Sequence, residues 1–228
     1  MRRSVQDHVA RMREPDRGLP IFLALLVLLV LVLPSLGLEG SDERLYSDIA
    51  TTLMLLFGIA VVSGHRRLFI LALLAAAAAL IVRWAVWLRP PGALGAWPDI
   101  VSCATVLVFS LMILVEVVRP GPVTIGRVQG AVAVYLLLGI GWASAYAVSE
   151  HVFPGSFVST AGAPTTVSDW IYFSFVTLTT VGYGDVVPAH RVARSLAIGE
   201  ALTGQLYIAV LLARLVSMAV STGNPPTR

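Results

Sequence analysis

Apolar residues occur in long, nearly uninterrupted runs along this chain, and polar residues collect in the short segments between them. A helix needs about 20 apolar residues to cross the hydrocarbon core of a bilayer. The second candidate is short by this measure, so we expect it to extend into its flanks. The pattern predicts an all-α integral membrane protein with six transmembrane helices. They are Leu19–Leu38, Asp48–Ser63, Leu68–Leu88, Asp99–Val118, Val128–Ser149 and Val192–Val220.

The composition agrees with a membrane protein. Hydrophobic residues make up 57% of the chain and charged residues 13%, whereas average globular domains carry about 25% charged residues. A formal charge of +3 is too small to favour a nucleic-acid partner. The polar lead before Leu19 is long and has no small-residue cleavage site, so we expect the first apolar run to be a retained helix rather than a signal peptide.

Arginine is unevenly distributed between the loops. Cytoplasmic loops of membrane proteins carry an excess of basic residues, and here the N-terminal tail and the loops after the second and fourth helices are basic, while the loop after the first helix is acidic. The distribution predicts a multi-pass cell-membrane protein with both termini cytoplasmic and segment 150–191 outside. The basic residues are Arg2, Arg3, Arg11, Arg13, Arg17, Arg66, Arg67, Arg119 and Arg127.

The segment between the fifth and sixth helices has the parts of a re-entrant loop. Ser168 is the expected N-cap of a short helix, with Asp169 in its first turn. The run "WIYFSFVTLT" is too short to cross a membrane, so we expect a half-helix over 168–178 that enters from outside. Irregular backbone at that depth is tolerated only where it is buried in protein or lines a watery cavity.

A short motif, "TVGYG" at 180–184, follows this half-helix. Successive carbonyl oxygens that point the same way can replace the water around a cation, and Gly182 and Gly184 can adopt the left-handed backbone that this requires. The Thr180 hydroxyl can add an oxygen at the inner end. The side chains of Val181 and Tyr183 are then expected to point away from the ion and to pack behind the motif.

"TLTTVGYGD", with a half-helix before it and a membrane helix on each side, resembles the pore domain of the potassium channel superfamily. The resemblance covers roughly residues 128–218. It implies that Thr180, Val181, Gly182 and Tyr183 coordinate K⁺ in a selectivity filter that Gly184 completes. It also implies that Asp185 lies at the outer mouth. K⁺ is then the permeant species, and no cofactor is expected.

The outer mouth departs from the family in two places. Val176 occupies a position where the family often has a glutamate that pairs with the mouth aspartate, so we expect Tyr172 or Trp170 to bond Asp185 instead. Val187 stands where an aromatic residue confers sensitivity to external tetraethylammonium. The sequence therefore predicts weak external block by that ion.

The last helix resembles the inner helix of the family. Gly204 matches a hinge glycine, although a small residue for close helix packing is an equal alternative. Ile208 and Leu212 follow at i+4 and i+8, so they are expected to line the cavity. Glu200 is a carboxyl group inside a membrane helix; it is either functional or, as we favour, a neutral or hydrogen-bonded brace for the half-helix.

Two arginines, Arg191 and Arg194, fall on the outer side in this topology. Arg194 matches a basic residue that binds anionic lipid headgroups in family members. Pairing with Asp185 of a neighbouring subunit is the other explanation. One filter copy is present and a pore needs four, so we expect a homotetramer with three identical subunits as partners, in contact with membrane lipids.

The first four helices lack the residues of a voltage sensor. A sensor needs regularly spaced arginines in its fourth helix, and Asp99–Val118 has none. Arg83 in the third helix is expected to snorkel to the membrane face. The eight residues after Val220 are too few for a ligand-binding domain. The expected channel is therefore passive, or gated at the filter, by lipid, by protons or by a partner.

The expected organisation has a cytoplasmic tail at 1–18, a sensor-like domain at 19–120, a pore domain at 121–220 and a short tail at 221–228. The pore domain contains an outer helix at 128–149 and an inner helix at 192–220. The sequence shows no enzyme signature. Alternative functions are a channel that responds to voltage by a non-standard route, a potassium transporter subunit or a non-conducting regulatory subunit.

Overall fold

The structure is a computed structural model that describes residues 18–36, 40–61, 66–88, 95–118, 124–159 and 166–223. Most of these residues lie in helices. The predicted tails lie almost wholly outside the described residues. In chain order the elements are α2 (Gly18–Val27), the π-helix η1 (Leu28–Val32), α3 (Leu33–Ser35), α4 (Gly40–Val61), α5 (Arg66–Ala85), the 3₁₀-helix η2 (Val86–Leu88), α6 (Trp97–Val118), α7 (Ile125–Val152), β1 (Phe157–Ser159), α8 (Val167–Leu178), β2 (Val186–Pro188) and α9 (Arg191–Gly223).

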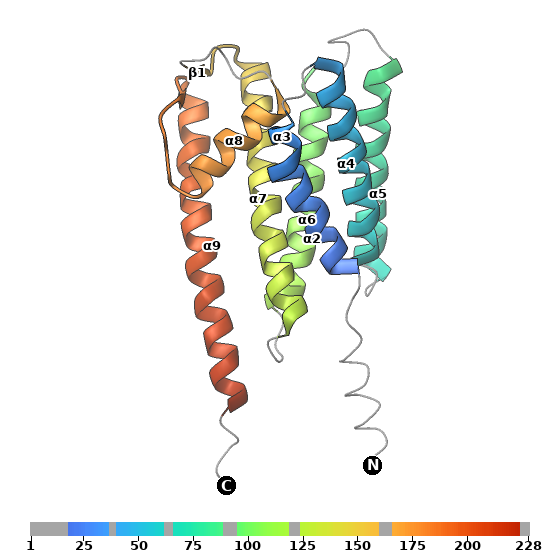
Figure 1. The fold of residues 1–228 in the computed structure, drawn as a ribbon, viewed down its shortest axis with the longest axis vertical. Coiled ribbons are helices and arrows are strands. Elements are labelled where there is room, and N and C mark those ends of the chain that lie inside the picture. Colours follow the sequence, from blue (N-terminus) through green and yellow to red (C-terminus); the bar gives the residue numbers. More distant parts are fainter. Residues whose placement is uncertain are drawn as a thin grey trace.

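The helices form two groups that meet at α7. Figure 1 shows α2, α4, α5 and α6 at one side of the molecule and α9 at the opposite edge. Between them α7 packs against α6 and α2 on one side and against α8 and α9 on the other. The short helix α8 is inclined to the rest, and the segment after it runs along the edge of the molecule away from α5 (Figure 1).

Three described helices are long and apolar enough to cross a membrane: Trp97–Val115, Ile125–Val152 and Arg191–Arg214. They correspond to the predicted fourth, fifth and sixth helices. The predicted first three coincide with shorter apolar helices, at Leu19–Val32, Leu45–Ile59 and Phe69–Ala85. The protein is thus a mostly helical membrane protein. In Figure 1, α2 begins and α9 ends at the same end of the molecule.

The expectation that the second helix extends into its flanks is confirmed, since α4 begins at Gly40, before the predicted start at Asp48. The purely helical prediction missed a small antiparallel sheet, in which β1 pairs with β2 so that Val158 lies opposite Val187. β-branched valines favour this extended backbone.

The prediction that Arg83 snorkels to the membrane face was also wrong. Its side chain on α5 forms an ion pair with the buried Asp48 of α4, and it donates hydrogen bonds to Ser47 and Ser102, each at 3.2 Å. Trp87 Nε1 donates to the second oxygen of Asp48 at 2.8 Å. Asp48 is buried, and an unpaired buried charge is very costly. Arg83 therefore pairs with Asp48 instead of extending to the membrane surface.

The apolar core lies where α6 and α7 meet, and it includes Phe109, Val134 and Leu137. In contrast, α9 leaves much of its apolar surface uncovered by the rest of the described chain. Ile198, Leu202 and Leu206, spaced four residues apart, are each more than half exposed. Residues at this spacing lie on one face of a helix, so α9 presents an apolar stripe away from its own chain.

Candidate functional site

The short helix α8 is the element that positions the motif at 180–184. Its N-cap is Thr166, whose side chain accepts a hydrogen bond from the amide of Asp169 while the Asp169 carboxylate accepts one from the amide of Thr166. Ser168, the predicted cap, is instead inside the helix. The reciprocal arrangement satisfies two amides that the helix leaves without partners. The predicted half-helix at 168–178 thus begins one residue early and ends where predicted.

The motif has alternating left-handed backbone. Gly182 and Gly184 have φ of +58° and +79°, as expected, and Thr180 has φ of +60°. Sequence reasoning did not foresee the left-handed Thr180, because β-branched residues rarely adopt positive φ. With left-handed residues at every second position, successive carbonyl groups can turn to the same side, as a cation site requires.

Hydrogen bonds with α8 and α9 hold the first residues of the motif. The amides of Val181 and Gly182 both donate to the Val176 carbonyl, at 3.0 and 3.3 Å. From α9, Gln205 Nε2 donates to Thr180 Oγ1 at 3.1 Å. Sequence reasoning missed Gln205, although a polar side chain in an apolar membrane helix is itself a functional signal.

The side chains of Val181 and Tyr183 are largely exposed in the single chain, at 54% and 71%. The expectation that they pack behind the motif is therefore not met within one copy. The motif lies at the edge of the molecule in Figure 1, beside α9.

Asp185 lies directly after the motif and accepts two hydrogen bonds. Tyr172 Oη donates to one oxygen at 2.6 Å, and the Val186 amide donates to the other at 3.1 Å. The bond from Tyr172 is the main reason why the pKa of Asp185 lies below its ordinary value. Of the two predicted partners, Tyr172 is thus confirmed. Trp170 is buried and packs edge-on against Phe157 instead.

Val187 is in the middle of β2, next to this mouth, and its side chain is partly exposed. The Tyr172 hydroxyl comes from α8, and the Asp185 carboxylate comes from the residue before β2. The small sheet connects the end of α7 with the exit of the motif, since β1 follows α7 and β2 follows Asp185. The predicted effect of Val187 on external block stays a prediction.

On α9, Gly204 lies against the C-terminal end of α8. A Cβ atom added at Gly204 would lie 2.1 Å from the Leu178 carbonyl oxygen, so only glycine allows this approach. This contact supports the close-packing alternative, while the hinge role stays a prediction. Ile208 and Leu212 lie further along α9 and are exposed in the single chain. Their predicted place on a cavity wall is likewise a proposal.

The Glu200 side chain is completely buried and hydrogen-bonded to Tyr146 and Ser174. Because Ser174 is in α8, the prediction of a hydrogen-bonded carboxyl group that braces the half-helix is confirmed. At the outer end of α9, Arg194 Nε donates to the Pro188 carbonyl at 3.2 Å. This bond fixes part of the Arg194 side chain at the exit of the motif.

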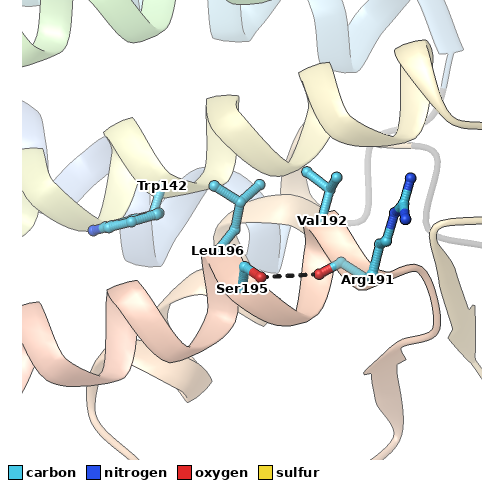
Figure 2. A pocket seen from close by; sticks show the side chains of 5 residues that line it. All are labelled: Trp142, Arg191, Val192, Ser195 and Leu196. Carbon is cyan, nitrogen blue, oxygen red and sulfur yellow. Dashed lines mark hydrogen bonds between the residues drawn. The ribbon is translucent and has the colours of Figure 1, made fainter.

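A pocket of about 360 Å³ lies between α7 and the start of α9. Figure 2 shows Trp142 of α7 opposite Val192 and Leu196, with the Arg191 side chain at one end and Ser195 bonded to the Arg191 carbonyl. The residues that line the pocket are mostly apolar, and the charged residue among them is Arg191. Arg194, the arginine singled out from the sequence, is not part of this lining.

A family model described as "Ion channel" matches residues 134–221, which contain α8, the motif and most of α7 and α9. This match covers the elements that position the motif. Residues 134–221 are thus similar to ion channels. In this range α7 overlaps the predicted outer helix, α8 the predicted pore helix and α9 the predicted inner helix.

Several curated potassium channels are similar to part of the chain. Two pore potassium channel c of Oryza sativa subsp. japonica is 39% identical over 83 residues, which are 36% of this chain and 17% of that protein. Two-pore potassium channel 4 of Arabidopsis thaliana is 45% identical over 53 residues, which are 23% of this chain and 19% of that protein.

A bacterial relative, Protein LctB of Geobacillus stearothermophilus, is 40% identical over 82 residues, which are 34% of this chain and 60% of that protein. The chain thus covers between 17% and 60% of the length of these relatives. No solved structure matches the chain significantly. The similarity does not extend over the whole of any of these proteins.

Proposed function

We propose that this chain is the subunit of a potassium-selective ion channel that conducts K⁺ passively across the cell membrane. The observation that carries the proposal is the alternating left-handed backbone at Thr180, Gly182 and Gly184. In this proposal the carbonyl groups of Thr180, Val181, Gly182 and Tyr183 replace the hydration shell of K⁺. The names of the similar potassium channels support the choice of ion.

Four identical subunits surround the pore in this proposal. One chain supplies one filter strand, and a ring of carbonyl groups needs four. The exposed side chains of Val181 and Tyr183 and the apolar stripe on α9 support such an assembly. Ile208 and Leu212 then line the cavity below the filter, and Gly204 allows α9 to approach the pore helix.

The proposed topology has six membrane helices and both termini in the cytoplasm. The three shorter apolar helices, Leu19–Val32, Leu45–Ile59 and Phe69–Ala85, support it. Arg194 lies at the outer boundary, where contact with anionic lipid headgroups or with Asp185 of a neighbouring subunit is available. α6 contains no arginine that could carry gating charge. The proposed channel is therefore not voltage-gated in the usual way.

A flux assay tests this proposal. The purified protein is reconstituted into liposomes, and ion uptake is measured near zero voltage without any ligand. Uptake of K⁺ and Rb⁺ well above Na⁺, blocked by Ba²⁺, is the expected result. Flux only on strong depolarisation would contradict passive gating, and no flux at any voltage would favour a non-conducting role.

A further inference from the structure

The buried carboxyl group of Glu200 joins the three helices of the pore domain. It extends from α9, and its Oε2 atom accepts a hydrogen bond from the Tyr146 hydroxyl of α7. Its Oε1 atom is 2.5 Å from the Ser174 hydroxyl of α8. Ser174 Oγ is also 2.7 Å from the Gly139 carbonyl oxygen of α7. The group therefore lies where all three helices meet.

The number of hydrogen atoms that this cluster needs indicates whether the Glu200 carboxyl group is protonated. Ser174 has one hydroxyl proton but two oxygen neighbours at hydrogen-bond distance, and the Gly139 carbonyl cannot donate. If Ser174 donates to Glu200, its contact with Gly139 has no hydrogen. If Ser174 donates to Gly139, the contact with Glu200 needs a proton on the carboxyl group. Only a protonated Glu200 places a hydrogen in each of the three contacts.

The residues around Glu200 also favour the protonated carboxyl group. Within the described residues, the hydrogen-bond partners of Glu200 are hydroxyl groups, and no basic side chain forms an ion pair with it. A buried carboxylate without a cation would be very costly inside a membrane protein. Tyr146, the partner on α7, is itself buried and edge-on to Phe157 and Phe173.

We propose that Glu200 is a neutral carboxylic acid that fixes α8 to α9 and α7, and that it is thereby a positioning residue for the filter. Ser174 and Leu178 are one turn apart on α8, and their partners Glu200 and Gly204 are one turn apart on α9. These two contacts set the end of α8 from which the filter starts. The positioning role rests on the proposed channel function, whereas the protonation state does not.

Infrared spectroscopy of the purified protein tests the protonation state. The difference spectrum between the wild type and Glu200→Gln is expected to show the carbonyl stretching band of a protonated carboxyl group. Glu150→Gln is the control, because this carboxyl group at the end of α7 accepts bonds from the amides of Gly155 and Phe157. Carboxylate bands in the Glu200→Gln difference spectrum would overturn the proposal.

Selectivity measurements test the positioning role. Glutamine can accept from Tyr146 and donate to Ser174 as the neutral acid does, so Glu200→Gln is expected to keep the wild-type ratio of K⁺ to Na⁺ flux. Glu200→Ala is expected to lower that ratio roughly tenfold, since it leaves the buried Tyr146 hydroxyl unpaired and removes the contact between α9 and Ser174. Ser174→Ala removes the contacts of α8 with Glu200 and with the Gly139 carbonyl but keeps the bond from Tyr146 to Glu200, so it is expected to lower the ratio less.

The outcomes separate this proposal from the channel function. Equal damage from Glu200→Gln and Glu200→Ala would overturn the positioning role, and so would an unchanged flux ratio in both alanine variants. Size-exclusion chromatography shows whether each variant is folded and assembled. If Glu200→Ala does not fold or assemble, the flux ratio of Ser174→Ala tests the positioning role. If the wild type itself carried no selective flux, the proposed channel function would fail, and the infrared result would still decide the state of Glu200.

Discussion

Individual residues set the backbone of the motif at 180–184, the proposed filter. Glycine adopts positive φ without a steric penalty, whereas the other residues pay about 1–2 kcal/mol. Thr180 adopts it nevertheless, with its amide bonded to Thr177 and its hydroxyl bonded to Gln205. These bonds stabilise a conformation that threonine alone would avoid. The same conformation at Gly182 depends on the absence of a side chain.

Gly182→Ala is therefore expected to abolish selective K⁺ flux, because the alanine would leave the left-handed region and turn a carbonyl group. Liposome flux of K⁺ and Na⁺ measures the effect. Gly155→Ala is the matched control, since Gly155 also has positive φ and open space around it but lies outside the filter. Equal loss of flux in both variants would show that general backbone strain, not the filter, is responsible.

Tyr172→Phe tests the residue beside Asp185. The bond from Tyr172 lowers the pKa of Asp185, so the wild-type mouth keeps its negative charge to a lower pH. Without that bond, the pKa rises toward its ordinary value, and the charge is lost at a higher pH. Acid inhibition of K⁺ flux should then begin at a higher pH in the variant. An unchanged acid midpoint would contradict the role of this bond, and Asp185→Asn controls for other titrating groups.

At the scale of elements, α8 and α9 approach each other closely at Gly204. Gly204 lies against the Leu178 carbonyl, so an added methyl group must push the helices apart. Overpacking of this kind typically costs about 1–3 kcal/mol. Gly126, on α7, has only ordinary contacts at 3.9 Å for an added methyl group.

Gly204→Ala is accordingly expected to lower the unfolding temperature in detergent, while Gly126→Ala leaves it unchanged or raises it slightly. The same variants can be compared in the flux assay. Reduced flux at an unchanged unfolding temperature would favour a hinge at Gly204 over close packing. Wild-type behaviour in both assays would contradict both roles.

The long apolar runs predicted most helices, and the pair Gly182 and Gly184 predicted where the backbone turns left-handed. The N-cap of α8 was missed because Thr166 and Ser168 are both good caps and lie two residues apart. The pair Asp48–Arg83 was missed because it joins different helices, and hydrophobic periodicity describes each helix separately. The two strands are too short, at three residues each, to give an alternating pattern.

At the scale of the whole molecule, the proposed pore requires more than one copy of the chain. The motif at 180–184 lies at the edge of the molecule (Figure 1), and the exposed Val181, Tyr183 and α9 stripe have no partner within the described residues. Native mass spectrometry of the purified protein is expected to show four copies. A monomer or dimer as the largest species in lipid would contradict the proposed assembly.

The central claim, selective conduction of K⁺, is tested most directly by a reversal potential. The purified protein is placed in a planar bilayer with K⁺ on one side and Na⁺ on the other, and the voltage of zero current is measured. Our account predicts a reversal potential far from zero, of the sign that K⁺ selectivity requires, and its loss in Gly182→Ala. A current that reverses near zero in the wild type would contradict the account, because such a pore does not distinguish the two ions.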